Sequence, residues 1–323
     1  MKKFRRTIVR VLLYVIGIVA LFLLTMTIYH HVMLSKEASL INPNRSFVSV
    51  DGHKMHVYAE GEKGNKPTLI IMSAYGIAAP VYDYKTLYSK LSDEYRIVVV
   101  EKFGYGYSDV SGLPRDISTM AKEDREALKL AGENGPYVLL PHSMSGLEAL
   151  YWAQHYPDEV SAIVGLDMSV PECYQINPHN LFPIKLLSSP EFLKVMTYMG
   201  LHRISIFYPV SERGLTKAEI AQNKYLTYKM TLNDDVIAES RAISSNAKKV
   251  QKGGMPNIPM LLFSSNGDST GLGDKWVQSE RNFASQSDKI KLIQLDCGHM
   301  IHYYKSDYIV QETKKFLQSD DLK

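Results

Sequence analysis

Short apolar runs of strand length recur along most of the chain and alternate with helical patterns. The first two runs are joined by Asp51-Gly52, a dipeptide typical of hairpins. The later runs are densely apolar, as expected of strands buried on both faces of a parallel sheet. The eight predicted strands span residues 46–50, 55–59, 67–72, 95–100, 137–140, 162–166, 260–263 and 290–295. This alternation predicts an α/β fold in which helices cover both faces of a mostly parallel, eight-stranded sheet.

One interval, residues 168–256, interrupts the alternation. Helix-start signals recur in it: Ser189-Pro190 places a cap before a proline, and Thr216 opens a capping box. A further helical stretch begins at Asn233 or Asp234 and ends at Gly253-Gly254. At about 90 residues the interval is far longer than a βαβ crossover needs, so it predicts a helical cap insertion. The insertion divides the predicted core into residues 36–167 and 257–323.

The N-terminal region contains an uncharged stretch at residues 11–29. Nineteen residues in a helix extend roughly 28 Å, close to the thickness of the bilayer hydrocarbon. A cleaved signal peptide is the alternative, but the apolar run exceeds the usual h-region and no A-x-A-like site follows it before Ala38. We therefore interpret residues 1–35 as a basic cytoplasmic tip and one uncleaved transmembrane anchor.

Charge predicts the orientation of this anchor. Five basic residues precede the apolar stretch, whereas only His30, His31 and Lys36 closely follow it. The positive-inside rule then places the N-terminus in the cytoplasm and the globular part outside the cell membrane. Taking those five from the 37 basic residues leaves 32 against 34 acidic ones, a net charge of −2. The globular part therefore carries no electrostatic signature of nucleic-acid binding.

The most informative motif is the sequence Leu-Leu-Pro-His-Ser-Met-Ser-Gly at residues 139–146. An apolar strand leads into Ser143, small residues flank this serine, and a helical pattern follows at once. A nucleophilic hydroxyl needs such a strained turn, with a base beside it and backbone N–H groups ahead of it. A serine that merely caps the following helix is the alternative reading.

Three blocks together resemble the α/β-hydrolase fold family. Residues 95–109, YRIVVVEKFGYGYSD, are similar to the family's fourth-strand block, and residues 141–146 resemble its G-H-S-M-G-G elbow. Cys297-Gly298-His299 resembles its histidine loop, and the similarity extends over residues 46–318 apart from the insertion. A serine at position 143 separates the chain from the family's dehalogenase and epoxide-hydrolase branches.

The resemblance implies a triad that runs serine, acid, histidine along the chain. Ser143 is the expected nucleophile. His299 is the expected base, with His302 as its rival, while His142 should point away from the nucleophile along the strand. Asp268, after the strand at 260–263, is the expected acid. Its alternatives are Asp167, at the end of the preceding strand, and Asp274.

The oxyanion hole is expected from the backbone N–H groups of Met144 and Tyr75. The chain departs from the family pattern near both. Ser73 and Ala74 replace the usual histidine and glycine, and the elbow has Pro141 and Ser145 where glycines are common. We therefore expect the conformation of both loops to differ from the family's usual form.

The resulting prediction is a membrane-anchored serine esterase that acts on a small-molecule acyl substrate through an acyl-enzyme. An aminopeptidase of the proline-iminopeptidase type is one alternative, and it would direct Glu172 or Glu212 at a substrate amine. A non-catalytic interaction module on the same fold is another. No cofactor or metal is expected, because no residue cluster has ligand spacing. The chain has two cysteines, Cys173 and Cys297, and a bridge between them is a further hypothesis. The oligomeric state is not predicted.

Aromatic side chains in the insertion indicate a substrate with an apolar acyl or aromatic group, although most of them are expected to form the insertion's own core. They are Tyr174, Phe182, Phe192, Tyr198, Phe207, Tyr208, Tyr225 and Tyr228.

Overall fold

A single eight-stranded sheet organises the molecule, in the order β1-β2-β4-β3-β5-β6-β7-β8. The computed structural model describes residues 2–41, 46–175, 189–206 and 208–319. The strands are β1 Phe47–Val50, β2 His53–Glu60, β3 Thr68–Met72, β4 Ile97–Glu101, β5 Tyr137–Ser143, β6 Val160–Met168, β7 Met260–Ser264 and β8 Ile290–Gln294. β2 pairs antiparallel with both β1 and β4, and the other neighbours are parallel. The predicted fold class and all eight predicted strands are confirmed.

The hairpin between β1 and β2 turns at the predicted dipeptide. Asp51 has φ 45° and Gly52 has φ 82°. Two successive residues with positive φ are required by a type I′ turn, whose twist matches that of the two strands. The turn therefore sets the register in which Val50 faces His53.

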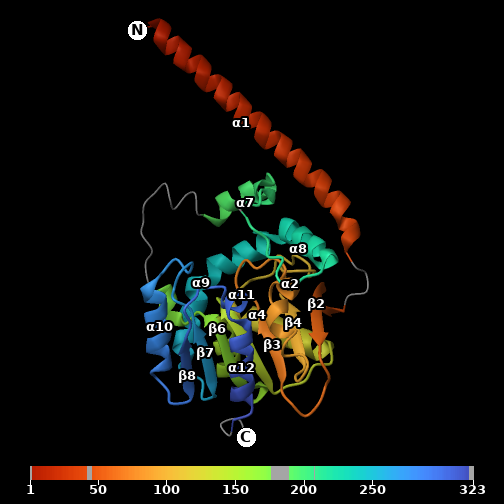
Figure 1. Ribbon diagram of the computed structural model, residues 1–323, viewed down its shortest axis with the longest axis vertical. Coiled ribbons are helices and arrows are strands. Elements are labelled where there is room, and N and C mark those ends of the chain that lie inside the picture. The colour runs from red at the N-terminus through yellow and green to blue at the C-terminus, as the bar shows by residue number, and fades with distance from the viewer. Residues whose placement is uncertain (1, 42–45, 176–188, 207, 320–323) are drawn as a thin grey trace.

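Helices cover both faces of the sheet (Figure 1). The helices outside the segment between β6 and β7 are α1 Lys2–Glu37, α2 Pro80–Asp83, α3 Lys85–Tyr88, α4 Ile117–Leu130, α5 Ser145–His155, α10 Asp274–Ala284, α11 Ile301–Tyr304 and α12 Ser306–Leu317. Side chains of α4, α5 and α10 pack on one face, and those of α2, α3, α11 and α12 pack on the other.

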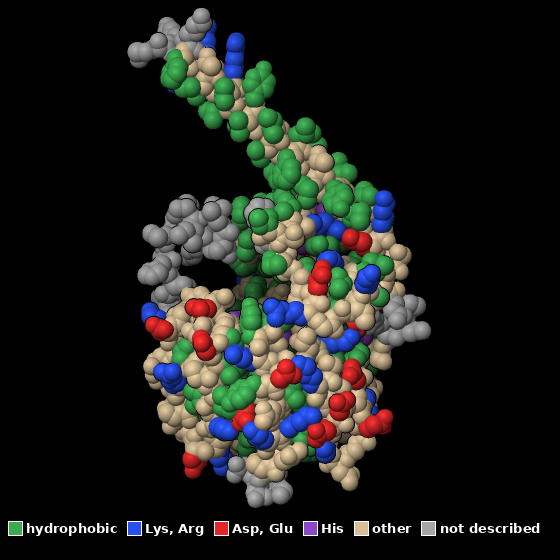
Figure 2. Space-filling view, viewed as in Figure 1, with side chains coloured by type: hydrophobic (Ala, Val, Ile, Leu, Met, Phe, Trp, Pro, Cys, Tyr) green, Lys and Arg blue, Asp and Glu red, His purple; other side chains and the backbone are tan. Residues whose placement is uncertain are grey.

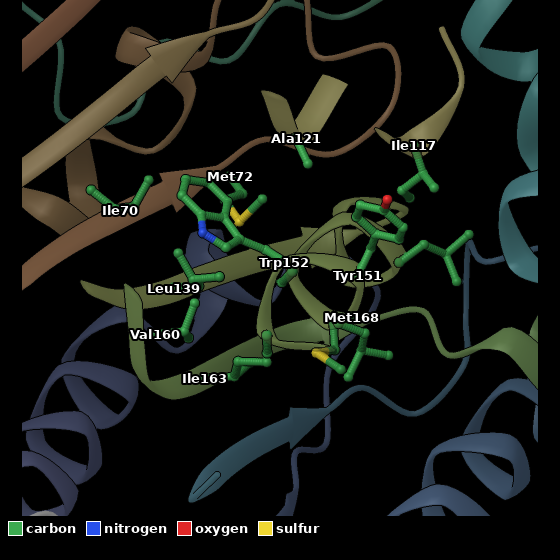
Figure 3. Close-up of a cluster of buried hydrophobic side chains, with 14 of the residues drawn as sticks. Ile70, Met72, Ile117, Ala121, Leu139, Tyr151, Trp152, Val160, Ile163 and Met168 are labelled. Atoms are coloured by element: carbon green, nitrogen blue, oxygen red, sulfur yellow. The ribbon is translucent and has the colours of Figure 1, made fainter. Parts of the chain in front are cut away.

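Alternation of side chains along the central strands produces these two cores. Ile70 and Leu139 point into one core, while Leu69 and Val138 point into the other. Figure 3 shows Trp152 of α5 close to the strand residues Leu139 and Met72 in the first core. Because α5 is buried along most of its length, it holds its N-terminal end firmly against the sheet.

The two cysteines are free thiols, so the hypothesis of a bridge is wrong. Cys173 is buried in the core on the α5 face, whereas Cys297 packs against the core on the opposite face. The side chains around Cys173 and those around Cys297 therefore lie on opposite faces of the sheet.

The segment between β6 and β7 is helical in its described part, and we call it the cap segment. Its elements are the 3₁₀ turns η3 Pro171–Tyr174 and η4 Leu201–Arg203, with helices α7 Pro190–Tyr198, α8 Lys217–Met230 and α9 Asp234–Gly253. The predicted helix starts are confirmed: Ser189 caps α7, Thr216 and Glu219 form a capping box, and Asn233 caps α9. In Figure 1, α7 and α8 lie above the ends of the strands, between the sheet and α1.

α1 is one long helix that extends away from the globular body (Figure 1). It is the single helix in the described residues that is long and apolar enough to cross a membrane, with a mean hydropathy of 2.7 in its apolar window. None of that window is buried in the molecule. Figure 2 shows hydrophobic side chains along α1, whereas charged side chains are scattered over the body.

Candidate active site

Ser143 ends β5 in a backbone conformation that an L-residue adopts only under constraint. Its φ is 54°, in the left-handed region, and Met144 and α5 follow at once. Such strain persists only where surrounding structure enforces it. A close approach of α5 to β6 does so here, because a Cβ on Gly146 would lie 2.3 Å from the carbonyl oxygen of Ser169. Gly146 therefore permits the sharp turn that presents the Ser143 hydroxyl.

Ser145, which stands where a glycine is common, connects the elbow to the neighbouring strand. Its buried Oγ accepts a hydrogen bond from the N–H of His142 at 3.0 Å and lies 2.8 Å from the carbonyl oxygen of Met72 in β3. β5 contains Pro141 in register with Met72. The hydroxyl therefore completes the hydrogen bonding at the end of this strand pair.

The imidazole of His299 faces the Ser143 hydroxyl. Its Nε2 lies 2.8 Å from Ser143 Oγ, within hydrogen-bond distance. His299 follows β8, and its backbone N–H donates to the carbonyl oxygen of Asp268 at 3.1 Å. The ring also packs edge-on against Trp276, with centroids 5.2 Å apart. These contacts hold the imidazole in an orientation suited to a general base.

Asp167 is the carboxylate that meets the other side of this imidazole. Its Oδ2 lies 2.5 Å from His299 Nδ1. Its Oδ1 accepts from the backbone N–H of Ser265 at 2.6 Å and from Trp276 Nε1 at 3.0 Å. Asp167 is fully buried in β6 with φ 48°. Each oxygen therefore has a fixed partner, which orients the carboxylate toward His299.

The expectation that Asp268 contacts the imidazole is therefore wrong for this structure. The Asp268 carboxylate is exposed and accepts from the side-chain amide of Asn266 at 3.0 Å. It follows β7, one strand beyond the strand that carries Asp167. Asp274 begins α10 and is also exposed. Asp167 is one of the two alternatives that the sequence offers, and it lies at the end of the preceding strand.

A second buried carboxyl group, on Glu280 of α10, lies near Asp167. Sequence reasoning missed it, because it lies within an amphipathic helix with no motif around it. Ser264 Oγ donates to Glu280 Oε2 at 2.6 Å. Burial, followed by the charge of Asp167, raises the pKa of Glu280 well above its ordinary value of 4.5. Burial therefore favours the protonated form of Glu280 beside the Asp167 carboxylate.

The expected oxyanion donors lie in two turns that face this site from different strands. Met144 follows Ser143, and Tyr75 lies in the turn after β3. Within the described residues, neither backbone N–H has a hydrogen-bond partner. The N–H groups beside Tyr75 are occupied: Ala74 donates to the Tyr84 hydroxyl at 2.9 Å, and Gly76 to the Tyr105 hydroxyl at 3.4 Å. The loop thus leaves the N–H of Tyr75 available while its neighbours are fixed.

The other two histidines of the region have structural partners. His142 Nε2 lies 3.1 Å from the carbonyl oxygen of His299, and its Nδ1 lies 2.7 Å from the Tyr84 hydroxyl. His302, the rival base, is buried with Nε2 3.1 Å from an Asp83 carboxylate oxygen and its ring stacked on Tyr84. His299 is therefore the imidazole that the fold brings to Ser143.

A buried ionic cluster joins the cap segment to the core near this site. Lys102 Nζ lies 2.8 Å from Glu239 of α9 and 3.4 Å from Glu148 of α5. Burial alone would lower the pKa of Lys102, but the carboxylates of Glu239 and then Glu148 outweigh it and raise the pKa above its ordinary value. Tyr105 donates to Glu239 at 2.6 Å and accepts from Gly76. α9 is therefore connected to the turn that carries Tyr75.

A cavity of about 280 Å³ opens between this turn, the residues after His299 and the cap segment. Its lining includes Gly76, Asp83, Tyr208, Thr227, Met300 and Tyr303. Of the aromatic residues singled out in the insertion, Tyr208 lines this cavity, and Tyr225 is buried in a cluster with Tyr82 and Leu226. Phe182 and Phe207 lie outside the described residues. The lining thus includes Gly76 and Met300, which follow Tyr75 and His299 in the chain, whereas the side chains of Ser143, His299 and Asp167 are not part of it.

Comparison with known proteins gives consistent results. The family model described as "alpha/beta hydrolase fold" matches residues 68–189. The uncharacterized protein YbdG of Bacillus subtilis is 35% identical over 311 residues, which cover 94% of each chain. An esterase from Exiguobacterium antarcticum has a TM-score of 0.65 at 17% identity and covers 85% of this chain and 100% of its own. A bacterial membrane phospholipase A has a TM-score of 0.56 at 18% identity and covers 98% of both chains. At these identities the two solved structures establish similarity of fold.

Proposed function

Because the chain belongs to the α/β-hydrolase fold family, we propose that it is a membrane-anchored serine hydrolase that cleaves a carboxylic ester or related acyl bond. One observation carries this proposal. The Ser143 hydroxyl lies 2.8 Å from His299 Nε2, and the opposite ring nitrogen lies 2.5 Å from the buried Asp167 carboxylate. Two successive hydrogen bonds thus link the proposed nucleophile, base and orienting acid.

In the first step His299 removes the proton from Ser143 Oγ as the oxygen attacks the substrate carbonyl carbon. The Asp167 carboxylate holds the proton on Nδ1, which leaves Nε2 free to accept, and it stabilises the imidazolium that forms. Collapse of the tetrahedral intermediate breaks the bond to the leaving group, which takes the proton from Nε2. The acyl group is then bound to Ser143 as an ester.

In the second step His299 takes a proton from water, whose oxygen attacks the acyl carbon. The Ser143 oxygen leaves and recovers its proton from Nε2, so the enzyme returns to its starting state. In both steps the N–H groups of Met144 and Tyr75 would donate to the developing oxyanion. Preorganised donors of this kind are worth about 10²–10³ in rate each.

α1 supplies the proposed membrane anchor. Its apolar stretch is long enough to span the hydrocarbon region, and five basic residues precede it. We infer a cytoplasmic N-terminus and an extracellular catalytic domain. A protease added to intact cells should then degrade the catalytic domain.

The positions of the two glutamates that would bind a substrate amine favour an esterase over an aminopeptidase. Glu172 accepts from Asn282 at 2.9 Å, and Glu212 pairs with Lys224 at 2.5 Å. Neither lines the cavity beside the oxyanion turn. The non-catalytic alternative has no need for a histidine aligned with both Ser143 and Asp167.

Labelling with a fluorophosphonate probe tests the catalytic proposal. The full chain, purified in detergent, should become labelled, because an activated serine forms a stable adduct with this probe. Ser143→Ala should abolish labelling, while Ser145→Ala, which changes the neighbouring hydroxyl, should retain it. Absence of labelling that depends on Ser143 would refute the proposal.

A substrate panel then tests the type of bond. Aryl esters of increasing acyl length should be hydrolysed by the wild type and not by Ser143→Ala. Aminoacyl arylamides should be poor substrates. Preferential cleavage of the arylamides would support the aminopeptidase instead.

A further inference from the structure

The membrane helix is joined to the cap segment by a partly buried polar cluster. Arg203 of η4 donates to both carboxylate oxygens of Glu37, at 2.9 and 2.6 Å, and through Nε to His30 Nδ1 at 2.8 Å. The Arg203 side chain is 6% exposed and that of Glu37 17%. A bidentate arginine–carboxylate pair shielded from water fixes geometry as well as charge. The end of α1 is therefore part of the cap structure and not a flexible tether.

Close packing strengthens the same joint. Gly200, at φ 78°, approaches α1 so closely that an added Cβ would lie 2.5 Å from the Cβ of His30. The ring of Tyr198, the last residue of α7, meets that of His31 edge-on with centroids 4.8 Å apart. The C-terminal end of α7 thus lies against α1 at residues 30–31.

The position of this joint along α1 sets its depth relative to a bilayer. The uncharged stretch at residues 11–29 spans roughly 28 Å, about the hydrocarbon thickness, and it ends one residue before His30. His30 and His31 therefore lie at the membrane–water interface whenever α1 spans the membrane. Because Tyr198 contacts His31, the end of α7 lies at the same level.

α7 presents apolar side chains outward at this level. Leu193, Val195 and Tyr198, with Ile206 just beyond η4, are between 38% and 83% exposed. Its charged side chains instead pair with α9: Lys194 with Asp234, and Glu191 with Arg241. A helix that faced bulk water would show the reverse distribution. Apolar and aromatic side chains are favoured where a helix meets the headgroup region.

We propose that α7 lies in the outer face of the bilayer that α1 spans, and that the enzyme draws a lipid-like acyl ester from that bilayer. This inference rests on the proposed membrane anchoring and hydrolase activity. Tyr208, two residues after the exposed Ile206, lines the cavity beside the oxyanion turn. The same part of the cap therefore contributes both an exposed apolar side chain and a residue of the cavity lining.

Tryptophan fluorescence in vesicles tests the position of α7. The native Trp152 and Trp276 are buried, so a tryptophan introduced by Val195→Trp in the full chain reports its own surroundings. In phosphatidylcholine vesicles with brominated acyl chains, its added emission should fall about twofold or more, since interfacial helices reach roughly 5–10 Å into the acyl boundary.

Leu130→Trp is the matched control. Leu130 is also an exposed apolar residue, but it ends α4, at the sheet edge opposite the cap. Its emission should be the same in brominated and unbrominated vesicles. Equal emission of Val195→Trp in both kinds of vesicle would overturn the proposal, and this result does not depend on catalysis.

A ratio of two rates tests the substrate class. The ratio is the rate on a long-chain ester embedded in vesicles divided by the rate on a soluble short-chain ester. Val195→Glu should lower this ratio by about tenfold, because a charge is costly at a lipid-facing position. Leu130→Glu should leave this ratio unchanged. An unchanged ratio in Val195→Glu would overturn the inference. If the wild type hydrolyses neither ester, the proposed hydrolase activity is refuted instead.

Discussion

The imidazole of His142 donates a hydrogen bond from Nε2 to the carbonyl oxygen of His299, 3.1 Å away. Because a carbonyl oxygen only accepts, Nε2 carries the hydrogen and Nδ1 accepts from the Tyr84 hydroxyl at 2.7 Å. The Tyr84 oxygen in turn accepts from the N–H of Ala74. One buried side chain next to the nucleophile therefore connects the base loop with the oxyanion turn.

We expect His142→Phe to lower both stability and turnover. It leaves the Tyr84 hydroxyl without its acceptor, which costs about 1–3 kcal/mol. It also removes one hydrogen bond from the His299 carbonyl, which keeps the N–H of Ile301 at 2.9 Å. The base loop and the oxyanion turn also lose their connection, so kcat should fall more than KM changes. Urea unfolding and ester kinetics measure the two effects. His142→Gln, which retains a donor and an acceptor, should recover part of both. Wild-type kcat in His142→Phe would contradict the positioning role.

The same histidine should make stability depend on pH. Burial, followed by the charges of His299 and His302, lowers the pKa of His142 well below 6.5. Below pH 6.5 the unfolded chain binds a proton that the folded chain does not, so the free energy of unfolding falls as pH falls. The contribution is at most about 1.4 kcal/mol per pH unit. Urea unfolding between pH 7.5 and 5 should show a shallower slope for His142→Gln, and equal slopes would argue against a neutral His142.

The acid of the triad can be identified by comparing two aspartates. Asp167→Asn should reduce kcat by about 10⁴, because the amide would favour the wrong tautomer of His299. Asp268→Asn should stay within a few-fold of wild type, since its carboxylate contacts Asn266 and its backbone carbonyl, which accepts from His299, is retained. Ester hydrolysis by both variants measures this. A large loss in Asp268→Asn alone would restore the expectation from the sequence.

Introducing the family's usual glycine at position 145 should destabilise this protein. Ser145→Gly removes the hydroxyl that joins the His142 N–H to the Met72 carbonyl. Leaving the buried N–H unpaired costs about 1–3 kcal/mol. Urea unfolding checks the direction. Ser161→Gly is the control. Ser161 is a partly buried serine of β6, outside the elbow, and its hydroxyl donates to a strand carbonyl. A stabilised Ser145→Gly would show that this hydroxyl is dispensable.

Glu280 should behave as a neutral hydrogen-bonding group. Glu280→Gln is expected to keep kcat within a few-fold, whereas Glu280→Leu removes the acceptor of the shortest Ser264 hydrogen bond, at 2.6 Å, and destabilises the site. Since the folded-state pKa is raised, the wild type loses stability as pH rises above 4.5. The Gln variant should therefore gain stability relative to wild type as pH increases. Urea unfolding at pH 5 and 8 measures the difference, and an opposite trend would indicate an ionised Glu280.

Much of the fold could be predicted from local pattern. The two-residue hairpin at Asp51-Gly52, the buried runs of the central strands and the helix caps at Ser189, Thr216 and Asn233 each depend on neighbouring residues along the chain. Such signals survive folding because turn geometry, capping and side-chain alternation are set within a few residues. The placement of Ser143 and His299 at one sheet edge also followed from strand order in the resembling family.

Patterns along the chain were enough to predict the sheet, the helical segment, the apolar N-terminal helix, and a serine and a histidine suited to acyl transfer. That Asp167, and not Asp268, contacts His299 depends on which strand end lies behind the imidazole, so it follows only from the packing of distant segments. Tertiary packing alone also revealed the buried Glu280 and the Arg203–Glu37 joint, since their partners lie far apart in the chain and no local pattern marks them.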